Sequence, residues 1–367
     1  MWVVAQPGDA QIVSAIRQEG FERSQAMETV SWLSDVFGPR VTGTPSIEAA
    51  KDWAAERMRR WGLRVYEERF PYGRGWSLER FHAHLVAPPT MPRIGYPRAW
   101  TTSTEGVVTA DVVRVAISSR DDLDQYRGML NGKIVLTQPV RPVEMLEGDL
   151  VLRLNEKLLA DVSQALQGTS EQKGSGGTGT RLDEYVNRFF VEEGVVAVLD
   201  RGSDMSLVGG APLGSDLVWP TQRTDGGTIF VGTGGSRAVD ARNAVPSATI
   251  AVEHYNRLVR LLELDVPVQV EVNIQTRFHE ETRPNGFNLI AELPGTDLAD
   301  EVVILGAHFD STHAATGATD NAVGVAAMME AVRILQTLDV RPRRTIRVAL
   351  WGCEEEGLLG SRAYVLR

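Results

Sequence analysis

The chain has 367 residues, of which 43% are hydrophobic and 23% are charged. This is an ordinary globular composition, and the length predicts roughly two domains. The 38 Lys and Arg against 48 Asp and Glu give a net charge of −10, which argues against a nucleic-acid binder. The single cysteine, Cys353, excludes an internal disulfide framework and a cysteine-rich metal module.

No apolar run approaches the roughly 18 residues that a membrane-spanning helix requires, so we expect no membrane span. The start of the chain lacks a basic segment, and its apolar stretch is too short for a signal-peptide core. Ala5-Gln6-Pro7 is compatible with two origins, the start left by a removed signal peptide or an ordinary terminus. The residues leave both origins open.

The N-terminal part of the chain is predicted to contain two helices followed by two strands. Apolar residues at helical spacing indicate a first helix over residues 11–37. Ser46 is the expected N-cap of a second helix that extends to residue 61. Its expected apolar face consists of Ala49, Trp53, Ala54, Met58 and Trp61. Strands are expected over residues 63–70 and 80–86.

The middle of the chain alternates short strands with helices. Strands are expected over residues 106–115, 133–137 and 195–199, and helices over residues 143–166 and 182–193. Residues 246–251 lead into a further expected helix that carries Tyr255, Leu258, Val259 and Leu262. The Gly-, Ser- and Thr-rich residues 167–180 are typical of a solvated surface loop, and a Gly-rich stretch covers residues 202–235.

The last third of the chain has the clearest pattern. Strands are expected over residues 268–276, 288–293, 301–306 and 345–351, and helices over residues 321–338 and 358–366. Residues 301–306 and 345–351 are apolar enough for buried strands. Buried strands that alternate with helices are typical of a parallel sheet. We therefore predict an α/β fold with a mixed sheet, mostly parallel in its core, flanked by helices.

Three polar segments follow or border strand ends in this last third: Gly306–Ser311, Gly317–Ala322 and Gly352–Gly357. Their chemistry-bearing residues are His308, Asp310, Asp320, Glu354 and Glu355. Ligands of open α/β sheets bind beyond the carboxyl ends of strands, so we expect these side chains to converge on one crevice. A histidine with carboxylates and no thiolate is the donor set of a hydrolytic zinc site.

The spacing of these residues suggests distinct roles. His308 and Asp310 are two apart, so extended backbone projects both to one side and Asp310 can orient the imidazole. Asp320 precedes an apolar helix, where its two oxygens can bridge two metal ions. Glu354 and Glu355 are adjacent and point in different directions, so one can bind metal while the other moves a proton. Such a site performs amide hydrolysis.

Each segment also has an ordinary structural explanation when it is taken alone. A His-x-Asp pair is more often a surface pair than a ligand pair, an aspartate before a helix is usually a cap, and a glutamate triplet usually lies on a solvated face. The joint occurrence of the three segments after three strand signals favours a metallopeptidase site.

Together the segments resemble the zinc-dependent exopeptidases of peptidase family M28, the aminopeptidase and carboxypeptidase Q-like group. The family strings Gly-Ala-His-Tyr/Phe-Asp-Ser, Asp-Asp-Asn-Ala-Ser-Gly and Gly-Ala-Glu-Glu-x-Gly-Leu-x-Gly-Ser correspond here to Gly306–Ser311, Thr319–Gly324 and Gly352–Ser361. In addition, Gly38–Pro45 is similar to a loop that these enzymes carry after their first helix.

The resemblance implies a domain organisation. Leu130–Leu136 and Val245–Ala248 look like parts of a protease-associated domain. We therefore expect an N-terminal part of the peptidase domain at residues 11–102, a smaller β-rich protease-associated insert at 103–262, and the catalytic core at 263–367.

The resemblance also implies roles for the site residues. His308 is expected to bind one zinc ion, Asp320 to bridge two and Glu355 to bind the second. Glu354 is the expected general base, and Asp310 the partner that orients His308. The implied cofactor is zinc, with two ions in the complete enzyme, and the implied partner is a peptide or protein substrate. Family habit favours a secreted or periplasmic location.

The chain departs from the family pattern after Glu355. Family members use two further ligands downstream, an acidic residue and a histidine, but the residues after Glu355 contain no histidine and no acid except Glu356. We therefore expect a chain that is the N-terminal portion of a longer enzyme, or a truncated product, and that binds zinc weakly and is inactive alone. Cys353 is expected to pack in the core, and His313 to lie on the rim of the site.

Two alternatives remain open at this point. An aminopeptidase is favoured, but a carboxypeptidase or dipeptidase is the alternative, because no residue fixes the substrate polarity. A non-catalytic binding or scaffold relative of the same fold is the alternative from another class. The intact acidic cluster argues against that relative, and the missing downstream ligands argue for it. The oligomeric state is open.

Overall fold

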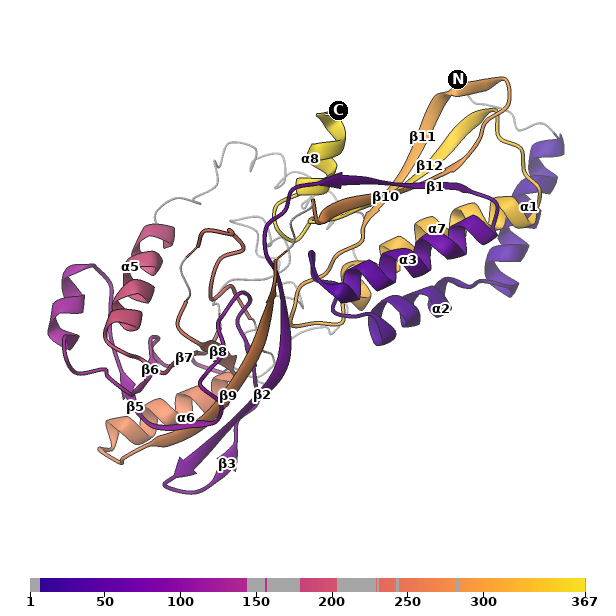
Figure 1. Ribbon diagram of the computed structural model, residues 1–367. Coiled ribbons are helices and arrows are strands. Elements are labelled where there is room, and N and C mark those ends of the chain that lie inside the picture. The colour runs from indigo at the N-terminus through magenta and orange to yellow at the C-terminus, as the bar shows by residue number, and fades with distance from the viewer. Residues whose placement is uncertain are drawn as a thin grey trace. The chain divides into compact units, whose positions relative to one another are not determined.

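The computed structural model describes residues 7–143, 156, 179–202, 229, 231–241, 244–280 and 284–366. The chain divides into two compact units (Figure 1). The first comprises Met1–Ser77, Arg237–Asp240 and Phe278–Arg367, and the second comprises Leu78–Ser236 and Ala241–Arg277. Three predicted segments lie mostly outside the described residues: the helix at 143–166, the loop at 167–180 and the Gly-rich stretch at 202–235. Residues 1–6, which bear on the origin of the N-terminus, lie outside them as well.

The first unit contains a four-stranded mixed sheet. Its strands, in spatial order, are β1 (Arg64–Phe70), β10 (Gly286–Leu293), β12 (Arg344–Trp351) and β11 (Leu298–His308). β11 and β12 are parallel, whereas β1 with β10 and β10 with β12 are antiparallel. All four strands fall where the apolar pattern predicted them, and the α/β class with a mixed sheet flanked by helices is confirmed. The expectation of a mostly parallel core is wrong for this described sheet, because β11 and β12 are its one parallel pair.

Helices cover both faces of this sheet. They are α1 (Pro7–Glu22), α2 (Ala26–Ser31), α3 (Pro45–Arg60), α7 (Val323–Thr337) and α8 (Leu359–Val365). α3 packs against β1 and β10 and α7 against β11 and β12, while α8 contacts β1 and β10 from the other face (Figure 1). The main core lies between the sheet and the helices α2, α3 and α7, with Leu33, Ile47, Met58, Phe287 and Met329 among its fully buried members.

The N-terminal helices differ from the prediction in two places. The helix expected over residues 11–37 is broken, because α1 ends at Glu22, α2 begins at Ala26, and the π-helical turn Trp32–Val36 follows. The N-cap of α3 is Thr44 and not Ser46, since Pro45 occupies the first turn, where a residue without N–H is tolerated. The Ser46 hydroxyl donates instead to the Phe37 carbonyl.

The buried face of α3 is shifted from the expected one. Ala54 and Met58 are buried as predicted, but Ala49 is exposed and Ala50 is buried in its place. Trp53 is only partly buried, because its ring stacks on Trp32 with centroids 5.6 Å apart at the edge of the core. The buried face of α3 is therefore displaced by about one residue from the predicted face.

The strand expected to be buried at residues 301–306 is largely exposed. Val302, Val303 and Ile304 are 40%, 44% and 47% exposed. β11 lies at the edge of the described sheet, so one of its sides has no neighbouring strand there. The apolar run at residues 301–306 correctly predicted a strand, but the prediction that this strand is buried was wrong.

The second unit is built on a sheet whose eight strands in the described residues have the order β3-β2-β9-β5-β6-β7-β8-β4. The bounds are β2 (Gly75–Ala87), β3 (Met91–Pro92), β4 (Gly95–Pro97), β5 (Val108–Arg114), β6 (Ile134–Leu136), β7 (Ala197–Asp200), β8 (Ser247–Ile250) and β9 (Gln269–His279). The central strands β5 to β8 are parallel. The helix α6 (Val252–Glu263) packs on one core and α5 (Gly179–Glu192) on another.

The chain passes between the units within β2, after Ser77, and within β9, after Arg277, and it also does so on either side of Arg237–Asp240. The second unit therefore includes residues on both sides of the insert expected at 103–262. None of the helices in the described part of the chain has the length and apolarity of a membrane-spanning segment.

Candidate metal centre

The carboxyl ends of β11 and β12 bring the expected site residues together. The two strands are parallel neighbours, and His308 at the end of β11 lies opposite Trp351 at the end of β12. Asp310 follows β11 by two residues, and Glu354 and Glu355 follow β12. Because parallel strands end at the same sheet edge, residues 44 and more positions apart in sequence come into contact.

Asp310 organises this edge from a fully buried position. Its Oδ1 accepts a hydrogen bond from the backbone N–H of Glu354 and its Oδ2 accepts one from that of Glu355, both at 3.1 Å. One side chain therefore ties the segment after β11 to the segment after β12.

His308 is oriented by the residue that the sequence indicated, but chiefly through its backbone. The Nδ1 of His308 lies 3.1 Å from the carbonyl oxygen of Asp310 and 3.6 Å from its carboxylate Oδ1. A carbonyl can only accept, so a neutral His308 carries its proton on Nδ1 and presents the lone pair of Nε2 on its other side.

His308, Asp320 and Glu355 form a convergent donor group. One potential ligand atom from each lies within 4.8 Å of the other two, and His308 Nε2 is 2.7 Å from Asp320 Oδ1. Asp320 belongs to the turn Ala318–Ala322 that precedes α7, and its non-helical backbone (φ −119°, ψ 92°) breaks that turn. Its side chain is 74% exposed, so this group faces solvent on one side.

Glu355 supplies the observation that bears on a metal. Its Oε1 is buried and has no hydrogen-bond partner in the described part of the chain. Buried carboxylate oxygens are normally hydrogen-bonded or paired with a cation. An unpartnered oxygen beside an imidazole and a second carboxylate therefore fits a divalent cation held by these three residues, and the donor set is one that zinc accepts.

The charges around the site shift its pKa values strongly. Burial, together with the charges of Asp320 and Asp310, raises the pKa of Glu355 to about 7. Burial opposes the charged form of His308, but Asp310 and Asp320 outweigh it and raise the pKa of His308 to about 9. Burial and the charge of Asp310 raise the pKa of Glu356 to about 8. This concentration of negative charge favours a bound cation.

Arg40 is a residue of the site that sequence reasoning missed. Its side chain is fully buried, and its guanidinium donates to the carbonyls of Phe309 (2.8 Å), Leu33 (2.7 Å), Thr316 (3.2 Å) and Gly317 (3.1 Å). Burial lowers the pKa of Arg40 to about 10, although Asp310 and Glu355 oppose this shift. Three of these carbonyls belong to the segment between His308 and Asp320, so Arg40 holds the backbone that carries both.

The signal for Arg40 in the sequence was its place in the loop Gly38–Pro45, which the family resemblance singled out without assigning a role. The backbone N–H of Arg40 also donates to Ser311 Oγ at 2.9 Å, and the Ser311 N–H donates to the Arg40 carbonyl at 3.2 Å. The loop is therefore bound to the segment after β11 through both backbone and side chain.

The remaining candidates near the site have different surroundings. Glu354 is half-buried and lies outside the convergent donor group identified among the described residues. Cys353 is fully buried, and burial raises the pKa of its thiol, which agrees with packing and not with a nucleophile. The expected rim position of His313 is wrong, because its ring packs edge-on against Trp76 (5.5 Å, 82°) and is only 8% exposed.

Asp310→Asn is expected to lower zinc affinity by about 10–100-fold, the usual cost of losing a residue that orients a ligand. The shape is conserved, but one oxygen becomes an NH₂ group that meets the N–H of Glu354 or Glu355, where a hydrogen bond cannot form. Competition with a chromophoric chelator measures the affinity. The surface variant Asp297→Asn, at an exposed pair with Arg343, is the matched control. Equal affinity of both variants would contradict the role of Asp310.

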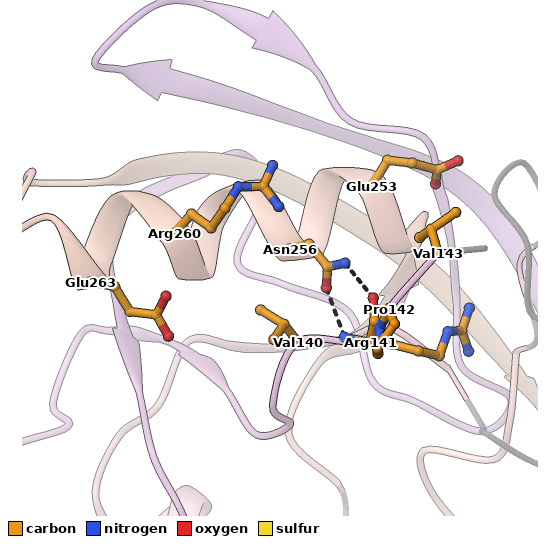
Figure 2. Close-up of a pocket in the computed structure, with 8 residues that line it drawn as sticks. All are labelled: Val140, Arg141, Pro142, Val143, Glu253, Asn256, Arg260 and Glu263. Carbon is orange, nitrogen blue, oxygen red and sulfur yellow. Dashed lines mark hydrogen bonds between the residues drawn. The ribbon is translucent and has the colours of Figure 1, made fainter. Parts of the chain in front are cut away.

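A separate pocket of about 600 Å³ lies in the second unit, between α6 and residues 140–143 (Figure 2). The amide of Asn256 faces Arg141, accepting from its N–H at 3.0 Å and donating to its carbonyl at 2.6 Å. Besides Arg141, the charged residues that line the pocket are Glu253, Arg260 and Glu263. The Asn256 amide therefore attaches residues 140–143 to α6. The residues that line this pocket include no nucleophile and no histidine.

The chain is similar to several known proteins. Residues 288–367 match the model of Peptidase family M28. Carboxypeptidase Q of Pongo abelii is 30% identical over 98% of this chain and 65% of its own length. Leupeptin-inactivating enzyme 1 of Streptomyces exfoliatus is 40% identical over 80 residues, which is 22% of this chain and 18% of that protein.

The crystal structure of a peptidase M28 precursor from Shewanella amazonensis SB2B superposes with a TM-score of 0.58 and 25% identity, over 97% of this chain and 70% of that one. The chain spans 65% of the length of the human and Pongo abelii carboxypeptidase Q sequences that it matches. The family match covers the segments that hold His308, Asp320 and Glu355, and the full-length similarities cover nearly all of the chain. Residues 288–367 therefore carry the match to Peptidase family M28, and nearly all of the chain is similar in sequence or structure to the proteins named above.

Proposed function

We propose that the protein is a zinc-dependent exopeptidase that hydrolyses peptide bonds at a chain end, with an aminopeptidase as the favoured form. The observation that carries this proposal is the buried Oε1 of Glu355, which lies beside His308 and Asp320 and has no hydrogen-bond partner among the described residues. The match of residues 288–367 to Peptidase family M28 supports a peptidase, and the donor set supports zinc.

His308, Asp320 and Glu355 are the residues that would hold the metal. When bound, zinc supplies Lewis-acid polarisation of the scissile carbonyl and a lowered pKa for water. Glu354 accepts the proton of the attacking water and passes it to the leaving amine. Asp310 fixes the backbone of Glu354 and Glu355, which keeps the base and the ligand in their relative positions.

The test uses the protein expressed from its complete gene and three substrates: an aminoacyl nitroanilide, an N-blocked peptide with a free carboxylate, and a dipeptide. An aminopeptidase releases nitroaniline from the first, loses this activity in a chelator, and regains it when zinc is added. A protein that binds zinc stoichiometrically but cleaves none of the substrates would overturn the proposal in favour of a binding or scaffold relative.

A second candidate is a carboxypeptidase, because the similarity to carboxypeptidase Q extends over 98% of the chain. In that case the N-blocked peptide is shortened from its carboxyl end and the aminoacyl nitroanilide is not cleaved. Cleavage of the dipeptide alone indicates a dipeptidase. The three substrates therefore separate the polarities in one experiment.

We further propose that residues 103–262 form a protease-associated insert, and that the protein acts on peptides outside the cytoplasm. The resemblance of Leu130–Leu136 and Val245–Ala248 to that domain type supports the first point. The family resemblance supports the second, and fractionation of the source cells tests it: recovery only in the cytoplasmic fraction would contradict it.

A further inference from the structure

Two histidines and a glutamate share one face of the sheet in the second unit. In β2, Ala83 and Leu85 point into the core, so His82 and His84 lie on the opposite face. In β9, Val270 and Val272 belong to the same core, and the residue between them, Glu271, lies on the opposite face as well. β2 and β9 are neighbours in the sheet, which places the three polar side chains together.

The three side chains are aimed at one another without hydrogen bonds between them. His82 Nε2 lies 3.6 Å and His84 Nδ1 lies 3.8 Å from the same oxygen, Oε1 of Glu271. Both distances exceed the 2.7–3.2 Å of a nitrogen–oxygen hydrogen bond. Tetrahedral zinc with ligands at about 2.0–2.2 Å separates neighbouring donor atoms by about 3.4 Å. The observed distances are therefore close to those of ligands that share one cation.

The Nδ1 of His84 gives a second, independent observation. This atom is buried and has no hydrogen-bond partner among the described residues. Buried imidazole nitrogens normally have a partner. Another histidine of the same unit, His254, follows that rule, since its Nδ1 accepts the N–H of Ile94 at 2.9 Å. A cation between His84 and Glu271 explains why this nitrogen has no hydrogen-bond partner in the part of the chain that the structure describes.

We propose that His82, His84 and Glu271 form a zinc site in the second unit, distinct from the site of His308. The two imidazoles and one carboxylate are ligands that zinc prefers. Their side chains are 33–38% exposed, so water completes the coordination. The cation cross-links β2 to β9, the two strands in which the chain passes between the units. Its role is to stabilise this strand pair and not to hydrolyse substrate.

The test counts metal ions in a protein whose other site has been removed. In the full chain with His308→Ala and Glu355→Ala, cobalt(II) is expected to bind at one equivalent and to give visible absorption typical of nitrogen and oxygen ligands. Addition of His84→Ala is expected to weaken that binding by at least about 10–100-fold. The control His254→Asn keeps an acceptor for Ile94 and is expected to leave binding unchanged.

Glu271→Gln separates the loss of a metal ligand from misfolding, because glutamine keeps the size of this partly exposed side chain and removes its charge. We expect weaker cobalt binding with an unchanged circular dichroism spectrum, and loss of the rise in unfolding temperature that zinc gives the parent variant. The proposal is overturned if the parent variant binds no metal, or if His84→Ala and Glu271→Gln bind it as tightly as the parent. None of these readouts depends on peptidase activity.

Discussion

In the protein expressed from its complete gene, Glu354→Gln is expected to reduce kcat for peptide hydrolysis by roughly 10²–10⁴-fold, the usual contribution of a general base. Glutamine keeps the backbone N–H that donates to Asp310 and nearly the same side-chain volume, but it cannot accept and release a proton. Because Glu354 lies outside the convergent donor group, zinc content is expected to stay unchanged. Steady-state kinetics and metal analysis on the same preparation measure both quantities.

Glu355→Gln is the matched comparison for this experiment, since the two residues are adjacent and both donate a backbone N–H to Asp310. Because Glu355→Gln removes a charged metal ligand, we expect it to reduce both the zinc content and the activity. The assignment of roles is refuted if Glu354→Gln loses zinc while Glu355→Gln retains it. In that case the two glutamates exchange functions.

Arg40→Met is expected to lower the free energy of unfolding by roughly 3–5 kcal/mol, because several buried carbonyls lose their donor at once. Methionine fills part of the volume but cannot donate to Phe309, Leu33, Thr316 or Gly317. The segment between His308 and Asp320 loses its anchor, so zinc affinity is expected to fall as well. Urea denaturation of the metal-free protein and chelator competition measure the two effects.

Arg40→Lys separates charge from geometry. Lysine keeps the positive charge near Asp310 and Glu355 but lacks the planar fork, so we expect only partial recovery of stability. Arg343→Met, at an exposed pair with Asp297, is the control and is expected to cost less than about 1 kcal/mol. An Arg40→Met protein with the denaturation midpoint of this control would show that the guanidinium does not hold the segment.

The strands and helices of the first unit were largely predictable from local pattern. The apolar runs at residues 288–293 and 345–351 correspond to β10 and β12, and residues 321–338 contain α7. The polar segments after β11 and β12 were also predictable as neighbours, since parallel strands end at one edge. These features depend on residue types and their spacing within a short window, and both can be read along the chain.

The details of burial and packing were not predictable in this way. Val302 to Ile304 have the apolarity of a buried strand, yet β11 is at the sheet edge and these residues are exposed. The buried face of α3 and the burial of His313 also differ from the prediction, because both depend on packing against segments distant in the sequence. A hydrophobic pattern shows which residues favour burial, and the order of strands decides which of them are buried.

The sequence by itself determined the identity of the donor atoms, the α/β class and the family resemblance, because these follow from residue types in short, ordered strings. Only the tertiary structure decided that Asp310 accepts the N–H groups of Glu354 and Glu355, that Arg40 reaches the carbonyl of Phe309, 269 residues away, and that His82 and His84 meet Glu271. Hydrogen-bond partners and convergent ligands depend on strand order and on the packing of distant segments, and these long-range contacts have no period that can be counted along the chain.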